Sequence, residues 1–449
     1  MNPFARRRAA LLAQMQALGG GVALIPTAPE VFRNSDVEYP YRHDSSFFYL
    51  TGFVEPDAVL VLVAGAQPQS ILFCRAKDPA REIWEGVRRG PDQAQQDCGV
   101  DAAYPIDAFD AKMPALLADA RAIFYAQGVQ PMRDTQLQSW LTQLRTRSRD
   151  GIHTPAIVHD VRALIDEMRL IKDVDEIAVM RRAATISAGA HQRVMRMARA
   201  GLREYELDAE LLHEFRRHGS DFPAYTSIVA TGANACILHY RAGPALLQDG
   251  DLVLVDAGCE LDGYASDISR TFPVNGQFSA PQRTLYEIVL AAQTAALAET
   301  RAGLHVRAGH HAALRVLAQG MLDTGLLDGA KVGSLEDVID SGAYRQFYMH
   351  GTGHWLGMDV HDVGRSHQLP SENTAGASDQ QRPWRLLQPG MTLTVEPGIY
   401  VRPAAGIPEQ YWHIGIRIED DVAIGTDGID ILSSDAPKSV AEIEALMQQ

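Results

Sequence analysis

Four acidic residues in apolar, strand-like segments are the side chains of this sequence best suited to bind metal ions. Asp256 ends the apolar run Leu252–Val255, and Asp267 follows it after a polar turn. Glu396 ends the segment MTLTVE, and Glu419 lies within IGIRIEDDV. A lone carboxylate is costly to bury in such surroundings, and two carboxylates at roughly 5 Å repel each other by about 3 kcal/mol at an effective dielectric near 20. If the four converge, divalent cations relieve this repulsion better than protonation does.

The segment 251–272 (DLVLVDAGCELDGYASDISRTF) predicts a β-hairpin with a polar turn at its centre. If the turn is centred on Leu261 and Asp262, Asp256 faces Asp267 directly across the ladder, with β-carbons roughly 5 Å apart. Like charges in that position destabilise a hairpin, so the pairing indicates a missing positive charge. A shift of the turn by one residue breaks the pairing, so the prediction depends on this register.

The segment 349–364 (MHGTGHWLGMDVHDVG) adds three histidines to these acids. His350 and His354 are spaced for one face of a helix, but each of the intervening and flanking glycines costs a helix about 1 kcal/mol relative to alanine. We therefore expect an extended, closely packed backbone that approaches a site. The four carboxylates and the imidazole of His354 match the ligands of two divalent ions bridged by acids. Any one of these acids alone is more often a surface charge, so the prediction depends on the whole set.

Helices and strands that position these residues are predicted in the carboxyl-terminal two thirds of the chain. The predicted helices cover about 174–200, 205–218, 282–302 and 306–324. The first has Asp173 as its cap, completing a capping-box-like pattern, and is expected to stop at Gly201. Strands are predicted over 391–396 and 414–422, and in the second strand Arg417 and Glu419 share one face.

Residues 1 to about 150 alternate helix and strand signals and contain no cluster of metal-type ligands. Buried strands are predicted at 22–25, 58–63 and 70–73, and helices at 111–120 and 135–145. The segment 151–160 contains Pro155 and is predicted to be an irregular connector. The sequence therefore predicts a smaller α/β domain over residues 1–172 and a metal-binding domain over residues 173–449.

Composition narrows the class of protein. The 449 residues are 46% hydrophobic and 22% charged, and the net charge of −15 argues against a nucleic-acid surface. The basic run Arg6–Arg8 precedes LLAQMQALGGG, but two glutamines interrupt the apolar part and no cleavage site follows, so an amphipathic first helix is favoured over an export signal. No apolar run reaches about 18 residues, so we expect no membrane span. The four scattered cysteines are predicted to be reduced core thiols in a cytoplasmic protein.

Four motifs in this order resemble those of the pita-bread metallopeptidases: VDAGCELDGYASDISRTF, MHGTGHWLGMDVHDVG, LTVEPGIY and IRIEDD. The sequence is most similar to the aminopeptidase P (Xaa-Pro aminopeptidase) branch, and the similarity extends to EYPYR and DSSFFYLTGF in the first domain. The resemblance implies an α/β (α+β) fold, with a pita-bread catalytic domain and a smaller amino-terminal domain of the creatinase/aminopeptidase P type. It also implies a homodimer or homotetramer.

The resemblance assigns roles to individual residues. The ligands of a dinuclear manganese centre would be Asp256, Asp267, His354, Glu396 and Glu419. Of these, Asp267 and Glu419 would bridge both ions. The other implied site residues are the active-site histidines His239, His350 and His361, Arg417 behind the metals, Tyr400 beside them, Trp84 lent to the pocket by a neighbouring subunit, and the pocket arginine Arg162.

The implied reaction removes the N-terminal residue from peptides with proline in the second position. A metal-bridged hydroxide would attack the carbonyl before proline, with Glu396 as the proton shuttle. His361 would stabilise the oxyanion, and His350 and His239 would position the scissile bond and the proline ring. Asp256, together with one ion, would bind the free amino group of the substrate, which makes the enzyme an exopeptidase.

Alternative functions share parts of this pattern. A dipeptidase of the prolidase type has every metal ligand, whereas a methionine aminopeptidase would not need the large first domain. Creatinase-like hydrolysis without metal is disfavoured because all five ligand positions are filled. The fold also occurs as a metal-free binding module, but such proteins typically lose the ligands. The ligand set also suits cobalt, iron or zinc.

Two features depart from the family pattern. His413 stands just before the IRIEDD strand, where a small residue is expected. The segment 365–389 is longer than expected for bacterial relatives, and its composition is typical of a mobile loop. This loop would reshape the rim of the pocket, so it affects the expected subsite preferences and leaves the chemistry unchanged.

Overall fold

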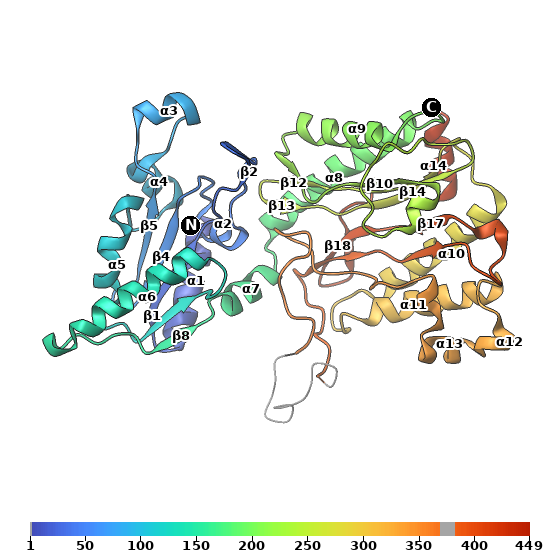
Figure 1. The fold of residues 1–449 in the computed structure, drawn as a ribbon. Helices are drawn as coiled ribbons and strands as arrows, with labels where there is room; N and C mark the ends of the chain where they lie inside the picture. The colour runs from blue at the N-terminus through green and yellow to red at the C-terminus, as the bar shows by residue number, and fades with distance from the viewer. Residues whose placement is uncertain (1, 369–381) are drawn as a thin grey trace. The chain divides into compact units, whose positions relative to one another are not determined.

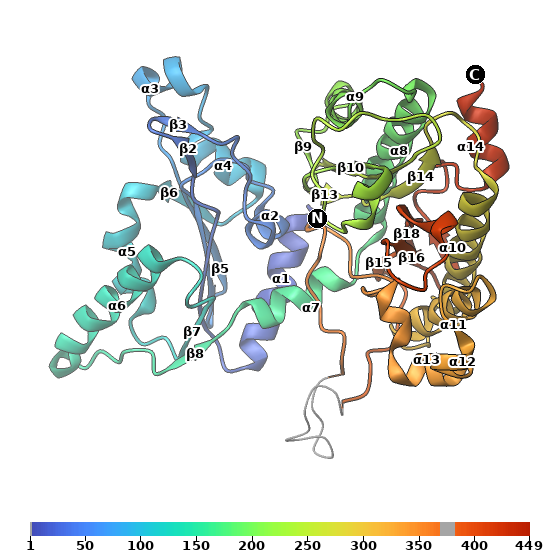
Figure 2. The same cartoon turned by 45° about the vertical axis from the view of Figure 1, so that its right-hand side comes forward.

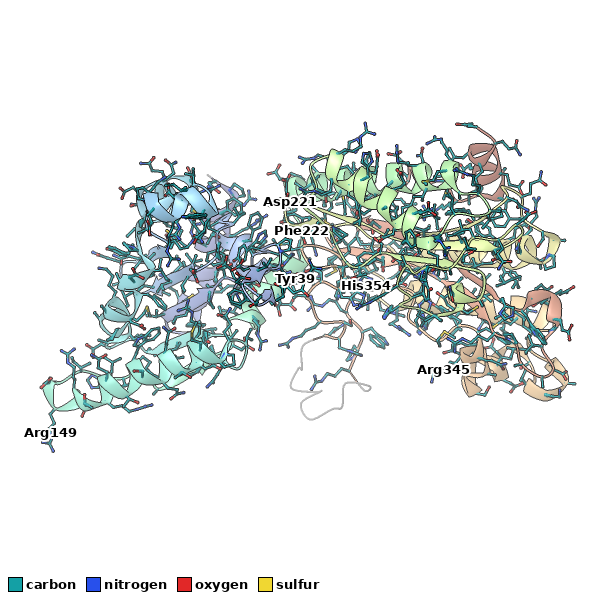
Figure 3. The ribbon with its side chains drawn as sticks, turned by 45° about the horizontal axis from the view of Figure 1, so that its top comes forward. Tyr39, Arg149, Asp221, Phe222, Arg345 and His354 are labelled. Atoms are coloured by element: carbon teal, nitrogen blue, oxygen red, sulfur yellow. The ribbon has the colours of Figure 1, made fainter. Side chains whose placement is uncertain are left out.

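The computed structural model describes residues 2–368 and 382–449 and divides into two units, Met1–Arg169 and Leu170–Gln449. The sequence predicts the division after residue 172. Residues 369–381 of the predicted mobile loop lie outside the described residues. Figure 3 shows the side chains of both units, with Arg149 and Arg345 pointing outward and His354 lying among the strands of the second unit.

The first unit is a six-stranded sheet with helices on both faces (Figures 1 and 2). The strand order is β6-β5-β4-β1-β7-β8. Its strands are β1 Gly21–Pro26, β4 Val59–Ala64, β5 Gln69–Cys74, β6 Ala102–Pro105, β7 Ala122–Tyr125 and β8 Ile157–His159, and a separate two-stranded hairpin consists of β2 Phe32–Asn34 and β3 Val37–Glu38. The helices are α1 Pro3–Ala17, α2 Ser45–Thr51, α3 Pro79–Glu85, α4 Gly90–Cys98, α5 Phe109–Leu117, α6 Pro131–Thr146 and, at the end of the unit, α7 Arg162–Leu170.

The predicted elements of this unit are found with shifted ends. The predicted first helix is α1, but two arginines of its basic run are buried, with Arg8 donating to the carbonyls of Leu50 and Cys98. The segment 151–160 is not wholly irregular, because β8 lies within it and pairs parallel to β7 at the edge of the sheet. A three-residue strand is too short to show a periodic pattern in the sequence.

In the second unit, the strands lie between the helix pair α8–α9 and the helix pair α10–α11 (Figures 1 and 2). The helices are α8 Val174–Met197, α9 Glu204–Arg217, α10 Ala280–Glu299, α11 Ala308–Asp323, α12 Gly329–Val332, α13 Leu335–Ser341 and α14 Val440–Met447. The strands of the first half are β9 Phe222–Pro223, β10 Ile228–Thr231, β11 Leu252–Asp256, β12 Cys259–Leu261, β13 Tyr264–Ala265 and β14 Ser269–Pro273. Those of the second half are β15 Thr392–Val395, β16 Gly398–Val401, β17 Ile414–Arg417, β18 Asp420–Ile424 and β19 Ile429–Ile431.

The start of α8 confirms the predicted capping box. The Asp173 side chain accepts from the backbone amide of Glu176, and the Glu176 side chain accepts from that of Asp173. The helix ends at Met197, before the predicted stop at Gly201, because Ala198 already has an extended backbone (φ −60°, ψ 129°). One continuous core of apolar side chains from α8–α11 and the strands holds this unit together.

The predicted pairing of Asp256 with Asp267 is wrong. Asp262 and Gly263 both have positive φ (50° and 80°), so the turn is centred one residue later than assumed. With this register, Asp256 pairs with Ser269. The ladder is also interrupted, because β11–β14 and β12–β13 belong to different sheets. Asp256 is the last residue of β11, where this interruption begins, and Asp267 lies within the interruption.

The predicted strand 414–422 is two strands. β17 pairs with β16, and β18 pairs with β15. Pro397 lies between β15 and β16; it has no amide proton to donate, so the ladder cannot continue past it. The second acid of this half, Glu419, lies at the corresponding break between β17 and β18, and its amide donates to the carbonyl of Ser269 at 3.1 Å.

The backbone of segment 349–364 is closely packed, as predicted, but it consists mainly of bends, with one isolated bridge at Trp355, where an extended backbone was expected. It contains no α-helix in the described structure. The amide of Thr394 donates to the carbonyl of His354 at 3.0 Å. A β-carbon at Gly353 would lie 2.0 Å from the carbonyl oxygen of Thr394, so glycine permits this approach.

All four cysteines are buried free thiols, as the composition suggests. Over 2–368 and 382–449, no helix has the length and hydropathy needed to cross a bilayer.

The close approach at the interruption between β11 and β14 predicts a strong effect of Gly258→Ala. An added β-carbon would lie 1.8 Å from the carbonyl oxygen of Ser266, so the backbone beside both aspartates must move. We expect the free energy of unfolding to fall by at least about 2 kcal/mol in denaturant titration.

The matched control is Gly189→Ala, where an added β-carbon on helix α8 meets nothing within 4 Å. This variant should be unchanged or more stable by up to about 1 kcal/mol. Equal unfolding midpoints for Gly258→Ala and the unaltered protein would contradict the tight packing at the interruption.

Candidate metal and active site

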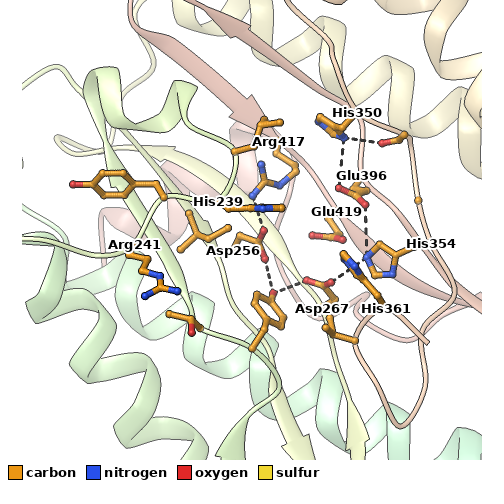
Figure 4. A pocket seen from close by; sticks show the side chains of 18 residues that line it. His239, Arg241, Asp256, Asp267, His350, His354, His361, Glu396, Arg417 and Glu419 are labelled. Atoms are coloured by element: carbon orange, nitrogen blue, oxygen red, sulfur yellow. Dashed lines mark hydrogen bonds and ion pairs between the residues drawn. The ribbon is translucent and has the colours of Figure 1, made fainter. Parts of the chain in front are cut away.

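A cavity of about 520 Å³ in the second unit gathers most of the predicted site residues (Figure 4). The predicted residues that line it are His239, Asp256, Asp267, His350, His354, His361, Glu396, Arg417 and Glu419. Tyr400 is buried behind this wall, where its hydroxyl lies 2.9 Å from Nε2 of His350. The other two predicted residues belong to the first unit: Trp84 on α3 is 87% exposed, and Arg162 pairs with Asp160.

Asp267, His354 and Glu419 form the tightest group of possible ligands. One candidate ligand atom from each residue lies within 4.8 Å of the others. Nε2 of His354 lies 3.4 Å from Oδ2 of Asp267 and 3.7 Å from Oε1 of Glu396. Nδ1 of His354 donates to the carbonyl of Trp355 at 2.9 Å, which leaves Nε2 to face the acids.

Two side chains hold Asp256 at the other end of the acid cluster. Arg417 donates to Oδ2 of Asp256 at 2.5 Å from Nη2. The hydroxyl of Tyr225 donates to Oδ1 of both Asp256 and Asp267, the second at 2.5 Å. Tyr225 therefore keeps the two aspartates close together although they are not opposite each other in a ladder.

Ser269 connects the two halves of the site. Its hydroxyl donates to Oε2 of Glu419 at 2.8 Å and accepts from Nε of Arg417 at 2.8 Å. Arg417 also donates to the hydroxyl of Tyr400 at 3.0 Å, and Tyr400 in turn contacts His350. One hydrogen-bonded chain thus runs from Glu419 to His350.

The acids differ in how their charge is stabilised. Burial by itself would raise the pKa of Asp256, but the Arg417 guanidinium holds it below its ordinary value. Burial and the charge of Asp256 raise the pKa of Asp267. Burial and the neighbouring acids raise the pKa of Glu419 well above the usual range, and burial raises that of Glu396 to about 7. Asp256 therefore has a guanidinium beside it that keeps it ionised, whereas the pKa values of the other three carboxylates are raised.

The histidines respond to the same charges in opposite ways. Burial by itself would lower the pKa of His354, but its interaction with Asp267 raises it to about 9. Burial and the charge of Arg417 lower the pKa of His350 to about 4. Burial and the neighbouring His354, whose ring centroid is 4.1 Å away, lower the pKa of His361.

This donor set fits divalent metal ions. Carboxylate oxygens and one imidazole are ligands that manganese, iron, cobalt and zinc accept. The carboxylates line one cavity and raise one another's pKa values, and a bound cation would compensate this repulsion. An imidazole whose Nδ1 is held by a backbone carbonyl is oriented as a metal ligand requires.

Sequence reasoning missed three residues that hold the acids in place: Tyr225, Ser269 and Asp421. The Asp421 carboxylate accepts from the amide of Asp267 at 3.1 and 3.2 Å, and burial next to Asp267 raises the pKa of Asp421 well above its ordinary value. Ser269 lies inside the quoted DISRT motif, and its spacing from Asp267 on alternate positions was a usable signal. Tyr225 lies in the short segment between β9 and β10, where no periodic pattern marks it.

The unexpected His413 has a backbone reason. Its φ is 65°, in the left-handed region where residues with small side chains are most common. Its amide donates to the carbonyl of Val401 at 2.8 Å and so begins the β16–β17 hairpin. The position explains why a small residue is expected there.

Comparison with known proteins agrees with this site. Residues 178–426 match the model of metallopeptidase family M24, and residues 4–125 match the aminopeptidase P N-terminal domain. The chain belongs to metallopeptidase family M24. Within this family it belongs to the aminopeptidase P (Xaa-Pro aminopeptidase) group, so the predicted pita-bread fold with an aminopeptidase P type first domain is confirmed.

Individual relatives match over nearly the whole chain. The Xaa-Pro aminopeptidase of Escherichia coli (strain K12) is 46% identical over 99% of this chain and 97% of that relative. The structure of Pseudomonas aeruginosa aminopeptidase PepP has a TM-score of 0.93 and 47% identity, covering 99% of this chain and 97% of that chain. A zinc-substituted Escherichia coli aminopeptidase P in complex with product has a TM-score of 0.92 and 45% identity, covering 99% of this chain and 98% of that chain.

The electrostatics predict how the stability of metal-stripped protein depends on pH. The pKa of Glu396 is raised from 4.5 to about 7, so its ionisation costs stability as the pH rises through that interval. The pKa of His354 is raised from 6.5 to about 9, so its stabilising contribution is present below 6.5 and lost as the pH rises through 9. Both effects have the same sign, whereas the lowered pKa values of His350 and His361 have the opposite effect below about pH 6.5, so the free energy of unfolding should fall between pH 7 and pH 9.

Urea unfolding of chelator-treated protein at several pH values measures this slope. Glu396→Gln is the matched variant: without the titrating carboxyl, its stability relative to the unaltered protein should rise between pH 5 and pH 7. Added Mn²⁺ should raise the unfolding midpoint more at pH 8 than at pH 5.5. A stripped protein that is equally stable at pH 7 and pH 9 would contradict the assignment of this pH dependence to His354.

Proposed function

We propose that this chain is a metal-dependent aminopeptidase that removes the N-terminal residue from peptides with proline in the second position. The convergence of four carboxylates and one imidazole around a single cavity carries the proposal. The whole-chain similarity to Xaa-Pro aminopeptidases supports the choice of substrate class. It also favours this activity over that of a prolidase, which would share the metal ligands.

Five residues would hold two divalent ions, which we propose to be Mn²⁺: Asp256, Asp267, His354, Glu396 and Glu419. Asp267 and Glu419 lie centrally and are the natural bridging ligands, since both belong to the tightest group of candidate ligand atoms. When bound, such ions lower the pKa of water and supply a nucleophile at neutral pH.

Glu396 is the residue that we propose to accept and return the proton. It is partly buried in the cavity wall, and its amide is fixed by a 2.8 Å hydrogen bond to the carbonyl of Thr352. Its carboxylate lies between two histidines, 3.7 Å from Nε2 of His354 and 3.8 Å from Nδ1 of His350. A carboxylate at the edge of the acid cluster can move a proton without leaving the site.

The histidines act differently. His361 is exposed to the cavity and free to stabilise negative charge that develops on the substrate carbonyl. Nδ1 of His350 donates to the carbonyl of Gly351 at 2.7 Å, and its Nε2 accepts from Tyr400. Both ring nitrogens of His350 therefore have protein partners. We propose that His350 holds the cavity wall in place for the substrate and does not transfer protons.

The substrate would bind with its free amino group at the acid end of the cavity. Asp256, already ionised beside Arg417, would share this amino group with one ion. His239, together with Leu238 and Val360, forms a partly apolar wall that suits the proline ring. A requirement for the free amino group is what makes the enzyme an exopeptidase.

Three further assignments are proposals that other observations support. Trp84 is 87% exposed, as expected of a side chain that a neighbouring subunit covers in a homodimer or homotetramer. The four free cysteines agree with a cytoplasmic location. The second unit, which contains the whole cavity, would be the catalytic domain, with its boundary at or near residue 172.

Metal removal tests the proposal directly. A chelator should abolish cleavage of an Xaa-Pro-Yaa tripeptide, and Mn²⁺ should restore it, because the nucleophile depends on the ions. The readout is release of the free N-terminal amino acid, with metal analysis of the same sample. Full activity of dialysed, metal-free protein would refute the mechanism, and cleavage of Gly-Pro in preference to the tripeptide would favour the prolidase alternative.

Glu396→Ala tests the ligand and shuttle roles together. We expect kcat to fall by at least about 1000-fold, equivalent to roughly 4 kcal/mol of transition-state stabilisation, while the fold is kept. The control is Glu299→Ala, an exposed acid at the end of α10 whose loss should not change kcat. Near-normal turnover by Glu396→Ala would rule out both roles.

A further inference from the structure

Two arginines line the cavity, Arg241 and Arg417. They differ in whether their side chains bond to other residues in the described part of the chain. Arg417 is 4% exposed and donates to an aspartate, a serine and a tyrosine of the site. Arg241 is exposed and also lines the cavity (Figure 4), yet its side chain makes no hydrogen bond or ion pair with any residue in the described part of the chain. Its guanidinium is therefore available to a ligand.

The loop that carries Arg241 is held by a buried carboxylate. Glu204, at the start of α9, is 0% exposed. It accepts four hydrogen bonds from this loop, from the amide of Thr231 (2.9 Å), the side-chain amide of Asn234 (2.9 Å), the hydroxyl of Tyr240 (2.9 Å) and the amide of Gly243 (3.0 Å). Two of these donors flank Arg241 on either side, so the backbone beneath it is fixed. The Cα atom of Arg241 therefore has a defined position in the cavity wall.

The same loop presents consecutive residues to the cavity. His239, Tyr240 and Arg241 all line it. The hydroxyl of Tyr240 is occupied by Glu204 and Asn234, so it is not available to bind substrate. Arg241 therefore adds a positive charge next to the wall proposed for the proline ring.

Charge complementarity identifies what this arginine would bind. The free amino group of a peptide is positively charged, so it would bind near the carboxylates of the site. A peptide with a free C-terminus also carries a negative charge, on the carboxylate at its other end. A guanidinium offers a planar pair of donors that matches both oxygens of a carboxylate. A carboxylate downstream of proline is thus the group that fits Arg241.

We infer that Arg241 is a specificity-determining residue that binds a carboxylate on the leaving side of the substrate, above all the free C-terminal carboxylate of a short peptide. This inference rests on the proposed aminopeptidase function and adds to it a preference for peptides in which the terminal carboxylate lies close to proline. A long peptide or a C-terminal amide lacks the charge at that place. The effect belongs to substrate binding, so it should appear in KM.

The test compares an Xaa-Pro-Yaa tripeptide with its C-terminal amide. We expect the unaltered enzyme to favour the free acid about tenfold in kcat/KM, as for one hydrogen-bonded charge pair. Arg241→Gln should remove that preference by raising KM for the acid, with kcat and the amide reaction unchanged. Arg241→Lys should retain part of it, because lysine keeps the charge without the paired donors.

Arg315→Gln is the matched control, since this exposed arginine of the same unit pairs with Glu336 outside the cavity. It should leave the acid-to-amide ratio unchanged, which excludes a general effect of net charge. Two amidated tripeptides, with Glu or Gln as third residue, identify the source of the carboxylate: a preference for Glu that Arg241→Gln removes means that the site also accepts a side-chain carboxylate.

Different results would contradict the proposed aminopeptidase function and the proposed role of Arg241. If metal-loaded enzyme cleaves neither the acid nor the amide, the proposed function is wrong. If it cleaves both with equal kcat/KM, or if Arg241→Gln slows both equally, the enzyme acts on Xaa-Pro peptides but Arg241 does not bind their carboxylate.

Discussion

Repulsion among buried carboxylates is the constraint on which the second unit depends. The pKa of Asp267 and that of Glu419 are raised by burial and by neighbouring acids, and the single fixed cation of the cluster, Arg417, is directed at Asp256. Arg417 therefore neutralises Asp256, whereas the pKa values of the other three acids stay raised. Bound cations would stabilise such an arrangement at neutral pH, which is why residues that are costly to bury can supply the chemistry of the site.

Both pairs of acids lie where a strand ladder is interrupted. Asp256 and Asp267 flank the gap between two sheets, and Glu396 and Glu419 flank the break at Pro397. A residue at such a break bonds its backbone to a partner outside its own ladder. The amide of Asp267 donates to the Asp421 carboxylate, that of Glu419 to Ser269, and that of Glu396 to Thr352. The first two of these bonds connect the two halves of the unit, and all three fix the backbone of acids whose side chains line one cavity.

This explains how far the sequence could predict the site. Acids in apolar strand segments and glycines near histidines are visible one residue at a time, so the candidate ligands and the helices could be identified. The hairpin register could not, because a shift of one residue depends on whether Asp262 adopts positive φ. The division of the strand 414–422 depends on a proline in its distant partner. Tyr225 acts only through tertiary contacts, which no local pattern reveals, whereas the alternate-position spacing of Ser269 from Asp267 was a usable signal.

Metal binding and substrate recognition depend on different parts of the unit. Four of the candidate ligands lie on or next to strands, whereas His239 and His361 stand on loops that buried charges fix from behind. Glu204 holds the first loop, and an ion pair of 2.9 Å between Lys172 and Asp362 holds the second. The residues that anchor these loops are not among the candidate metal ligands. A residue on a loop can therefore be substituted without altering the charge balance between the acids and the metal ions. Substrate preference can therefore differ between proteins that share the same metal site, and Arg241 occupies a position where such a difference would arise.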